Sequence, residues 1–122
     1  MIELLSPDFT HSDERGKLVQ IVSDGYRQVN MLYSKAGTVR GNHYHKVNNE
    51  AFFVVSGTVE VTSNSGDEQS RGTFHSGDFF LIKPYVIHSL YFTEDCVLVA
   101  LYDRGVELLD SGKDIYTENY LI

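Results

Sequence analysis

This sequence has one cysteine, few basic residues and no long apolar run. Acidic residues outnumber basic ones by 17 to 10, giving a formal net charge of −7, which argues against nucleic-acid binding. No apolar stretch reaches the length of a membrane span. The N-terminus lacks a basic start before a hydrophobic segment, so we expect no signal peptide and a cytoplasmic protein. Cys96 lies in an apolar run, which predicts a buried core residue rather than a nucleophile.

Helix-period amphipathic stretches longer than two turns are also lacking. Short runs with strand character are instead separated by turn residues, a pattern typical of an all-β barrel or jelly roll. At 122 residues there is room for one core, so we expect a single domain over residues 1–122. The expected strands are 17–23, 28–34, 51–55, 57–63, 87–93 and 96–101.

Three histidines and a glutamate have the order and spacing of a metal site built on strands. Residues two apart in a strand project to the same face, so His43 and His45 should point inward together while Tyr44 points away. A turn at residues 48–49 should return Glu50 to their side. His88 begins a later strand that the barrel would bring alongside.

Neutral imidazoles with one carboxylate suit a divalent transition metal. We expect zinc, iron, manganese, nickel or copper at His43, His45, Glu50 and His88, and not magnesium or calcium. Four protein ligands on an octahedral ion leave two positions for water or substrate, as in a catalytic site. The alternative is a site in which the histidines act as acid and base without metal.

These two segments resemble the two motifs of the cupin family. Residues 37–57 are similar to the first motif, with His43, His45 and Glu50 at its ligand positions, and residues 77–88 to the second, with His88 as the fourth ligand. The second segment departs from the motif at Lys83, Tyr85 and Phe92, where proline, glycine and asparagine are usual. The resemblance implies a single cupin β-barrel.

Within cupins, the sequences of residues 13–16, 40–46 and 93–99 resemble those of sugar-nucleotide enzymes. One similar group is the dTDP-sugar 3,4-ketoisomerases, in which histidines shuttle protons without metal. The other is the C-terminal cupin domain of bifunctional capsular-polysaccharide enzymes, which holds a metal and epimerises a keto-sugar of a UDP-sugar. Glu50 favours the metal-binding group. The implied substrate is a small molecule, a dTDP- or UDP-sugar.

Both resemblances imply proton removal next to a ketone, followed by reprotonation elsewhere. Such chemistry needs a base, an oxyanion stabiliser and exclusion of water. With metal bound the histidines are ligands, and the candidate bases are Tyr33, Tyr44 and Tyr91, helped by a cation such as Arg40 or the metal. Strand alternation places Tyr44 and Tyr91 off the ligand face, whereas Tyr33 matches a pocket tyrosine of the ketoisomerases within a residue. Without metal, His43 or His45 is the base. Arg40, Lys46 and Lys83 flank the ligand segments and can make the site locally positive.

Two other classes of protein remain open, the first because iron and copper cupins have the same shell of four ligands. One is an iron or copper cupin dioxygenase, and the other is a non-catalytic sugar-binding cupin. Strands 51–55 and 96–101 are apolar on both faces, and we expect the outer face to be covered by a second sheet or by a partner in a homodimer. The tail, residues 104–122, has a turn signal at 110–112 and should pack back over the barrel or onto a partner.

Overall fold

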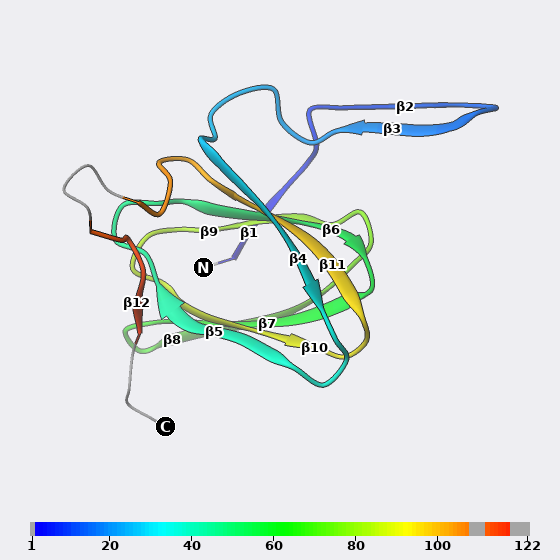
Figure 1. Cartoon of the computed structure of the whole chain (residues 1–122). Coiled ribbons are helices and arrows are strands. Elements are labelled where there is room, and N and C mark those ends of the chain that lie inside the picture. The colour runs from blue at the N-terminus through cyan, green and yellow to red at the C-terminus, as the bar shows by residue number, and fades with distance from the viewer. Residues whose placement is uncertain (1, 108–111, 118–122) are drawn as a thin grey trace.

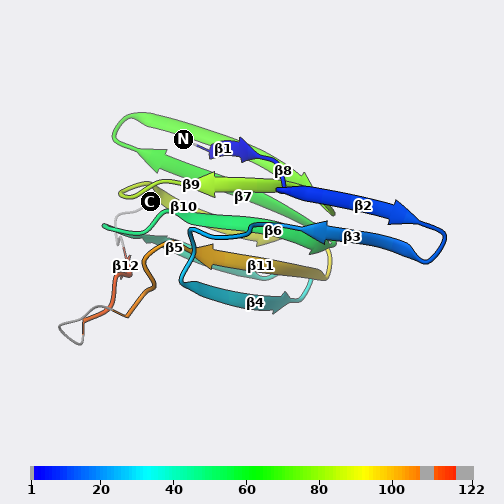
Figure 2. The ribbon, with the colours of Figure 1, turned by 90° about the horizontal axis from the view of Figure 1, so that it is seen from above.

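Two antiparallel five-stranded sheets stacked face to face make up the body of the protein (Figures 1 and 2). The computed structural model describes residues 2–107 and 112–117. One sheet has the order β1-β9-β6-β11-β4, the other the order β12-β5-β10-β7-β8. In chain order the strands are β1 (Ile2–Leu5), β2 (Phe9–Asp13), β3 (Gly16–Gln20), β4 (Gln28–Ser34), β5 (Val39–Tyr44), β6 (Glu50–Ser56), β7 (Thr58–Ser65), β8 (Glu68–His75), β9 (Phe79–Ile82), β10 (Ile87–Phe92), β11 (Cys96–Tyr102) and β12 (Tyr116–Thr117).

The main core fills the space between these sheets. Alternate residues of each strand point inward, so every second apolar side chain of β6, β7, β10 and β11 is buried there. Phe80 stacks on both Phe52 and Phe74, with ring centroids 5.3 and 4.1 Å apart. The all-β sandwich expected from the sequence is confirmed, and every regular element in the described part of the chain is a strand.

The outer face of β6 and β11 is covered from within the chain. Ala51, Phe53, Val99 and Leu101 form a second buried cluster, completed by Phe79. The end of β3 and the segment after it pack on this cluster through residues that include Val19, Ile21, Val22 and Tyr26. The expected strand over 17–23 therefore ends at Gln20, and the residues after it serve as a cover. This part of the outer face needs no partner subunit.

Strands β2 and β3 form a separate two-stranded hairpin that projects away from the sandwich (Figures 1 and 2). Phe9 is 53% exposed and Leu18 is 57% exposed, so apolar surface remains open on this arm. Among the described residues, no helix is long and apolar enough to span a bilayer. The turn expected at residues 110–112 lies largely outside the described residues.

Candidate metal and substrate site

The first two ligand-type residues come from the end of β5. His43 lies on the strand and His45 directly follows it, and both rings point into the sandwich. Tyr44 points the other way, where its ring stacks on Tyr85 and Tyr116 at centroid distances of 6.2 and 5.4 Å. The alternation predicted for residues 43–45 is therefore confirmed.

Glu50 is the first residue of β6 and returns to the two histidines through a tightly held turn. The carboxylate of Asp114 accepts main-chain N–H bonds from Lys46 at 2.7 Å, from Val47 and from Asn48 at 3.0 Å. The next residue, Asn49, donates its main-chain N–H to Asp103 at 2.9 Å. These bonds fix the turn and place the Glu50 side chain in the interior, where it is 2% exposed.

His88 reaches the cluster from β10, which pairs directly with β5. His88 is the register partner of His43 in this pairing. The preceding turn is tied to β5 as well, because the main-chain N–H of Tyr85 donates to the carbonyl of His45 at 2.7 Å. Tyr85 has a φ of 68°, the left-handed conformation that glycine adopts without strain. The tyrosine at this motif position thus keeps the glycine-like backbone of the turn.

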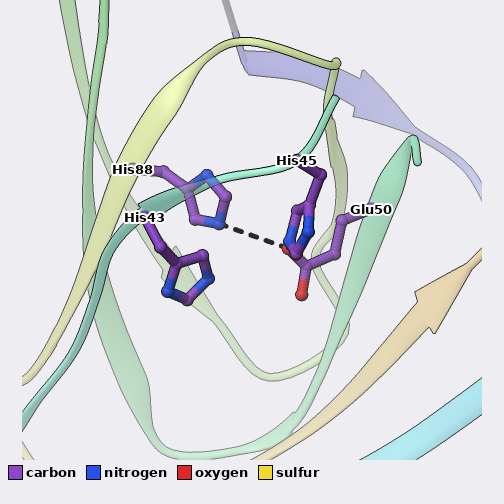
Figure 3. Close-up of side chains that lie close together, drawn as sticks. All are labelled: His43, His45, Glu50 and His88. Atoms are coloured by element: carbon purple, nitrogen blue, oxygen red, sulfur yellow. Dashed lines mark hydrogen bonds and ion pairs between the residues drawn. The ribbon is translucent and has the colours of Figure 1, made fainter. Parts of the chain in front are cut away.

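The four side chains converge on one point (Figure 3). One potential ligand atom from each of His43, His45, Glu50 and His88 lies within 4.8 Å of the other three. Oε1 of Glu50 is 2.9 Å from Nε2 of His45 and 3.2 Å from Nε2 of His88. The structure therefore brings together all four residues that the sequence predicts as a ligand set.

The hydrogen bonds around the rings suit a cation at this point. Nδ1 of His45 lies 2.5 Å from the carbonyl oxygen of Asp114, and Nδ1 of His88 lies 3.0 Å from that of Val86. A carbonyl only accepts, so each Nδ1 donates its proton, and a neutral ring then presents the Nε2 lone pair. Both Nε2 atoms face the same Glu50 oxygen, and without metal the Nε2 of His45 hydrogen-bonds to that oxygen. His88 Nε2 is buried and completes no hydrogen bond. A divalent metal among these atoms would satisfy all of them, so the residues present fit such an ion.

Burial and the mutual charges of the cluster shift its pKa values. Burial, and then the neighbouring His88, lowers the pKa of His43 to about 4, so His43 is neutral at pH 7. Burial opposes ionisation of Glu50, but its contacts with His45 and His88 outweigh this and lower its pKa to about 2. Burial also opposes protonation of His45, yet the hydrogen bond with Glu50 raises its pKa overall. At neutral pH the site holds a buried carboxylate that needs a positive partner.

A cavity of about 310 Å³ opens beside the cluster, within the size range of small-molecule sites. Arg40 lines it, anchored by a 2.8 Å hydrogen bond from Nε to the Ser34 hydroxyl and by Nη2 to the carbonyl of Tyr33. The other lining residues are Leu32, Gly41, His43, Glu50, Phe52, Leu90, Tyr102 and Ile115. A cation is thus fixed at the wall of a largely apolar pocket.

Of the other charged and tyrosine residues predicted near the site, three lie elsewhere. The side chain of Tyr33 is on the outer face of β4, 70% exposed, and its hydroxyl donates to Sδ of Met31 at 3.0 Å. Lys46 lies with its Nζ 4.2 Å from the ring centroid of Tyr116. Lys83 forms an exposed ion pair with Glu3. Within this chain, only Arg40 of the predicted cations lines the cavity.

Two site residues were missed by the sequence reasoning. Tyr102, the register partner of Glu50 on β11, is 9% exposed, and its ring lies edge-on to His45 at 5.6 Å. Burial, the charge of Glu50 and a hydrogen bond with it raise the pKa of Tyr102 well above its usual range. The second is Asp114, whose carbonyl holds His45. The sequence carried a signal for Tyr102, because alternation along the strand places it on the same inward face as Leu98 and Ala100.

Fold and site together define a cupin, with the ligand cluster between the two sheets of the jelly roll. Residues 11–93 match the family described as the polysaccharide biosynthesis C-terminal domain, and the chain belongs to that family. No curated protein matches the sequence.

Solved structures with this fold include several sugar-nucleotide enzymes. The sugar 3,4-ketoisomerase QdtA from Thermoanaerobacterium thermosaccharolyticum, in complex with TDP, has a TM-score of 0.79 at 20% identity, with 97% of this chain and 88% of that chain covered. A double mutant of the same enzyme, also with TDP, has a TM-score of 0.72 at 25% identity, covering 84% and 79%. The dTDP-4-dehydrorhamnose 3,5-epimerase from Sulfolobus tokodaii has a TM-score of 0.69 at 19% identity, covering 98% and 72%.

Proposed function

We propose that this chain is a cupin isomerase or epimerase that acts on a nucleotide-linked keto-sugar and holds one divalent transition metal at His43, His45, Glu50 and His88. The observation that carries the proposal is the buried cluster of three imidazoles and a carboxylate that opens into a cavity lined by Arg40. The family match to polysaccharide biosynthesis and the fold shared with TDP-sugar enzymes support the substrate class.

The sugar of the substrate would bind in the cavity, and its diphosphate would bind to Arg40 at the cavity wall. The cavity of about 310 Å³ has room for a sugar ring, with apolar contacts from Leu32, Phe52 and Leu90. The guanidinium of Arg40 is the cation that would pair with a diphosphate, because its planar array of donors matches phosphate oxygens. Its bonds to Ser34 and to the Tyr33 carbonyl hold it in place before substrate arrives.

The chemistry would be proton transfer next to the sugar ketone. A bound divalent metal supplies Lewis-acid polarisation of a carbonyl oxygen. Tyr102 stays protonated at neutral pH and so can donate a proton or hydrogen bond into the cavity. His43, neutral at pH 7 and also facing the cavity, is the group that would accept a proton if the site works without metal.

We further propose a homodimer that buries the outer face of β4. This strand lies at the edge of its sheet, and its outward residues Val29, Met31 and Tyr33 are 61%, 54% and 70% exposed. Adjacent exposed apolar side chains of this kind mark association surfaces. Light scattering after size exclusion tests this: a single monomer peak at micromolar concentration would contradict it, and Met31→Lys should shift a dimer towards monomer.

The test of the enzymatic proposal is solvent-hydrogen exchange into a keto-sugar nucleotide. Metal-loaded protein is incubated with TDP-4-keto-6-deoxyglucose in D₂O, and the carbon next to the ketone is followed by NMR. We expect deuterium incorporation together with a changed sugar, an effect lost when His43 is replaced by Asn. A parallel oxygen-electrode trace and a thermal-shift series with TDP, UDP and GDP complete the experiment. Oxygen uptake without exchange, or no stabilisation by any nucleotide, would overturn the proposal.

A further inference from the structure

The C-terminal segment 112–117 contacts the ligand cluster more closely than any sequence pattern suggested. We propose that Asp114 is a positioning residue for the metal site: by holding His45 and the turn before Glu50, it couples docking of this segment to metal affinity. This inference rests on the metal-binding part of the proposed function. It adds that docking of segment 112–117 regulates metal binding.

The main chain of Asp114 sets the orientation of His45. Its carbonyl oxygen lies 2.5 Å from Nδ1 of His45, and both residues are buried. This contact keeps a proton on Nδ1, so that Nε2, which hydrogen-bonds to Glu50 at 2.9 Å without metal, is the nitrogen that would bind a cation. Without it the ring could rotate or place its proton on Nε2, and it would no longer present a lone pair to a cation.

The side chain of Asp114 holds the backbone between two ligands. Its carboxylate is fully buried and accepts N–H bonds from three successive residues, Lys46, Val47 and Asn48. The Asn48 amide donates to it as well, at 2.8 Å, and also to the carbonyl of Gly105. One carboxylate thus organises the whole turn that separates His45 from Glu50.

The residues after Asp114 lie beside β5, the strand that carries His43. Ile115 lines the cavity together with His43 and Glu50. Tyr116 and Thr117 form β12, which pairs with Tyr44 and His43 of β5. The ring of Tyr116 stacks on that of Tyr44 at the end of β5, and the Nζ of Lys46 lies over the Tyr116 ring. The segment therefore contacts the site at His45, at the turn and at His43.

Within the described residues, the regular structure that holds this segment on the barrel is β12 and an isolated bridge between Lys113 and Glu107. β12 has two residues, and before it Asp114 donates its main-chain N–H to the carbonyl of Val106 at 2.7 Å. Much of its attachment is the buried polar contact of Asp114 itself. Removing those contacts should release the segment without dismantling the two large sheets, because the apolar core between them has no member from residues 112–117.

The experiment compares two pairs of variants. Asp114→Ala is matched by Asp103→Ala, which removes the comparable hold on Asn49 but touches no ligand side chain. A chain ending at Gly112 is matched by one ending at Thr117. For each, Zn²⁺ affinity is measured by calorimetry, Co²⁺ coordination by its visible absorption, and the His45 ring tautomer by ¹⁵N NMR of the metal-free protein.

We expect Asp114→Ala and the chain ending at Gly112 to lose about 10- to 100-fold in Zn²⁺ affinity, the range seen when a partner of a ligand is removed. Their Co²⁺ spectra should change and the His45 Nδ1–H signal should be lost, while both controls keep the wild-type values. Folded variants with unchanged affinity and tautomer would overturn the inference, as would a wild-type protein that takes up no metal. Loss of isomerase activity alone would bear on the proposed function and leave this coupling untouched.

Discussion

Gly41 packs directly against the main chain of His88. A Cβ atom on Gly41 would lie 2.7 Å from the His88 carbonyl oxygen and 2.9 Å from Cα of Ser89, and both contacts are with backbone that cannot move aside cheaply. The irregular register of β10 against β5 also falls between His88 and Ser89. The close approach of these strands therefore sets where His88 lies in the cluster.

Replacing Gly41 with alanine should displace His88. We expect Gly41→Ala to lower the free energy of unfolding by about 1–3 kcal/mol and to weaken metal binding, as overpacking and backbone strain both apply. The control is Gly37→Ala, because Gly37 also has a positive φ but its Cβ would meet no atom within 4 Å. Urea unfolding and Zn²⁺ calorimetry measure the two effects. Equal metal affinity in both variants would contradict this account of His88.

Removing the charge of Glu50 should abolish tight metal binding. Glu50→Gln keeps the shape of the side chain but leaves two imidazole lone pairs facing a neutral amide, so the affinity loss should exceed about 100-fold. Metal content after purification, determined by mass spectrometry, should fall from near one ion per chain to near zero. Glu94→Gln, which removes a carboxylate outside the cluster, should retain metal. Retention by both variants would show that Glu50 is no ligand.

Stability of the metal-free protein should fall as the pH drops from 7 towards 4. His43 has a folded pKa of about 4, below the unfolded value of about 6.5, so the unfolded chain binds more protons in this window. The expected loss is on the order of 2–3 kcal/mol. Glu50, with its pKa lowered to about 2, adds a further loss below pH 4.5. The raised pKa of His45 acts oppositely, and its contribution disappears as the pH rises above 6.5.

Urea unfolding of chelator-treated protein at several pH values measures this dependence. His43→Asn should show a shallower slope between pH 6.5 and pH 4.5, because the group that titrates there in the unfolded chain is gone. A variant with the wild-type slope would contradict the assignment to His43.

Arg40 should control affinity for the diphosphate of a nucleotide. Arg40→Ala should weaken TDP or UDP binding by at least about 10-fold, since a hydrogen bond to a charged group contributes about 1.5–3 kcal/mol. Arg40→Lys should recover only part of this, because an ammonium cannot reproduce the planar fork held by Ser34. Calorimetry gives the affinities. Lys83→Ala is the control, its charge being paired with Glu3 at the surface. An equal loss in all three variants would indicate a general charge effect.

The catalytic roles of Tyr102 and Tyr33 can be distinguished by removing one hydroxyl at a time. Tyr102→Phe should lower kcat about 10²-fold, the smaller end of acid–base effects, with little change in KM, because the hydroxyl faces the cavity and Glu50. Tyr33→Phe should have the smaller effect, since that hydroxyl is bonded to Met31 outside the sandwich. The reverse order would favour the tyrosine chosen from the sequence and a different arrangement of β4.

Much of the predicted cluster follows from local geometry, whereas the place of His88 beside the other three residues follows from the resemblance to the second cupin motif. His43 and His45 follow from alternation along one strand, and Glu50 follows from a turn of known composition. The strand that carries His88 was also recognisable, ending within one residue of its expected end. These are short-range rules, and the structure confirms the positions they predict.

β4 shows why the tyrosine could not be placed. Its alternating inward positions combine the polar Asn30 and Ser34 with Leu32, while Val29, Met31 and Tyr33 are more than half exposed on the other face. Apolar residues therefore occupy both faces of β4, and the sequence pattern does not show which face is inside. The contact of Asp114 could not be predicted for another reason. Asp114 is 69 positions from His45 in the sequence, and only folding brings the two residues together.

The four clustered side chains come from different layers of the sandwich. Glu50 lies on β6 in one sheet, whereas His43 and His88 lie on β5 and β10 in the other. An ion held by all of them would be a cross-link between the two layers of the folded protein. With Cys96 as its one cysteine, this protein has no sulfur bridge to supply that restraint. Separation of the two sheets would then require release of the ion, so the loaded protein should unfold far more slowly than the metal-free one.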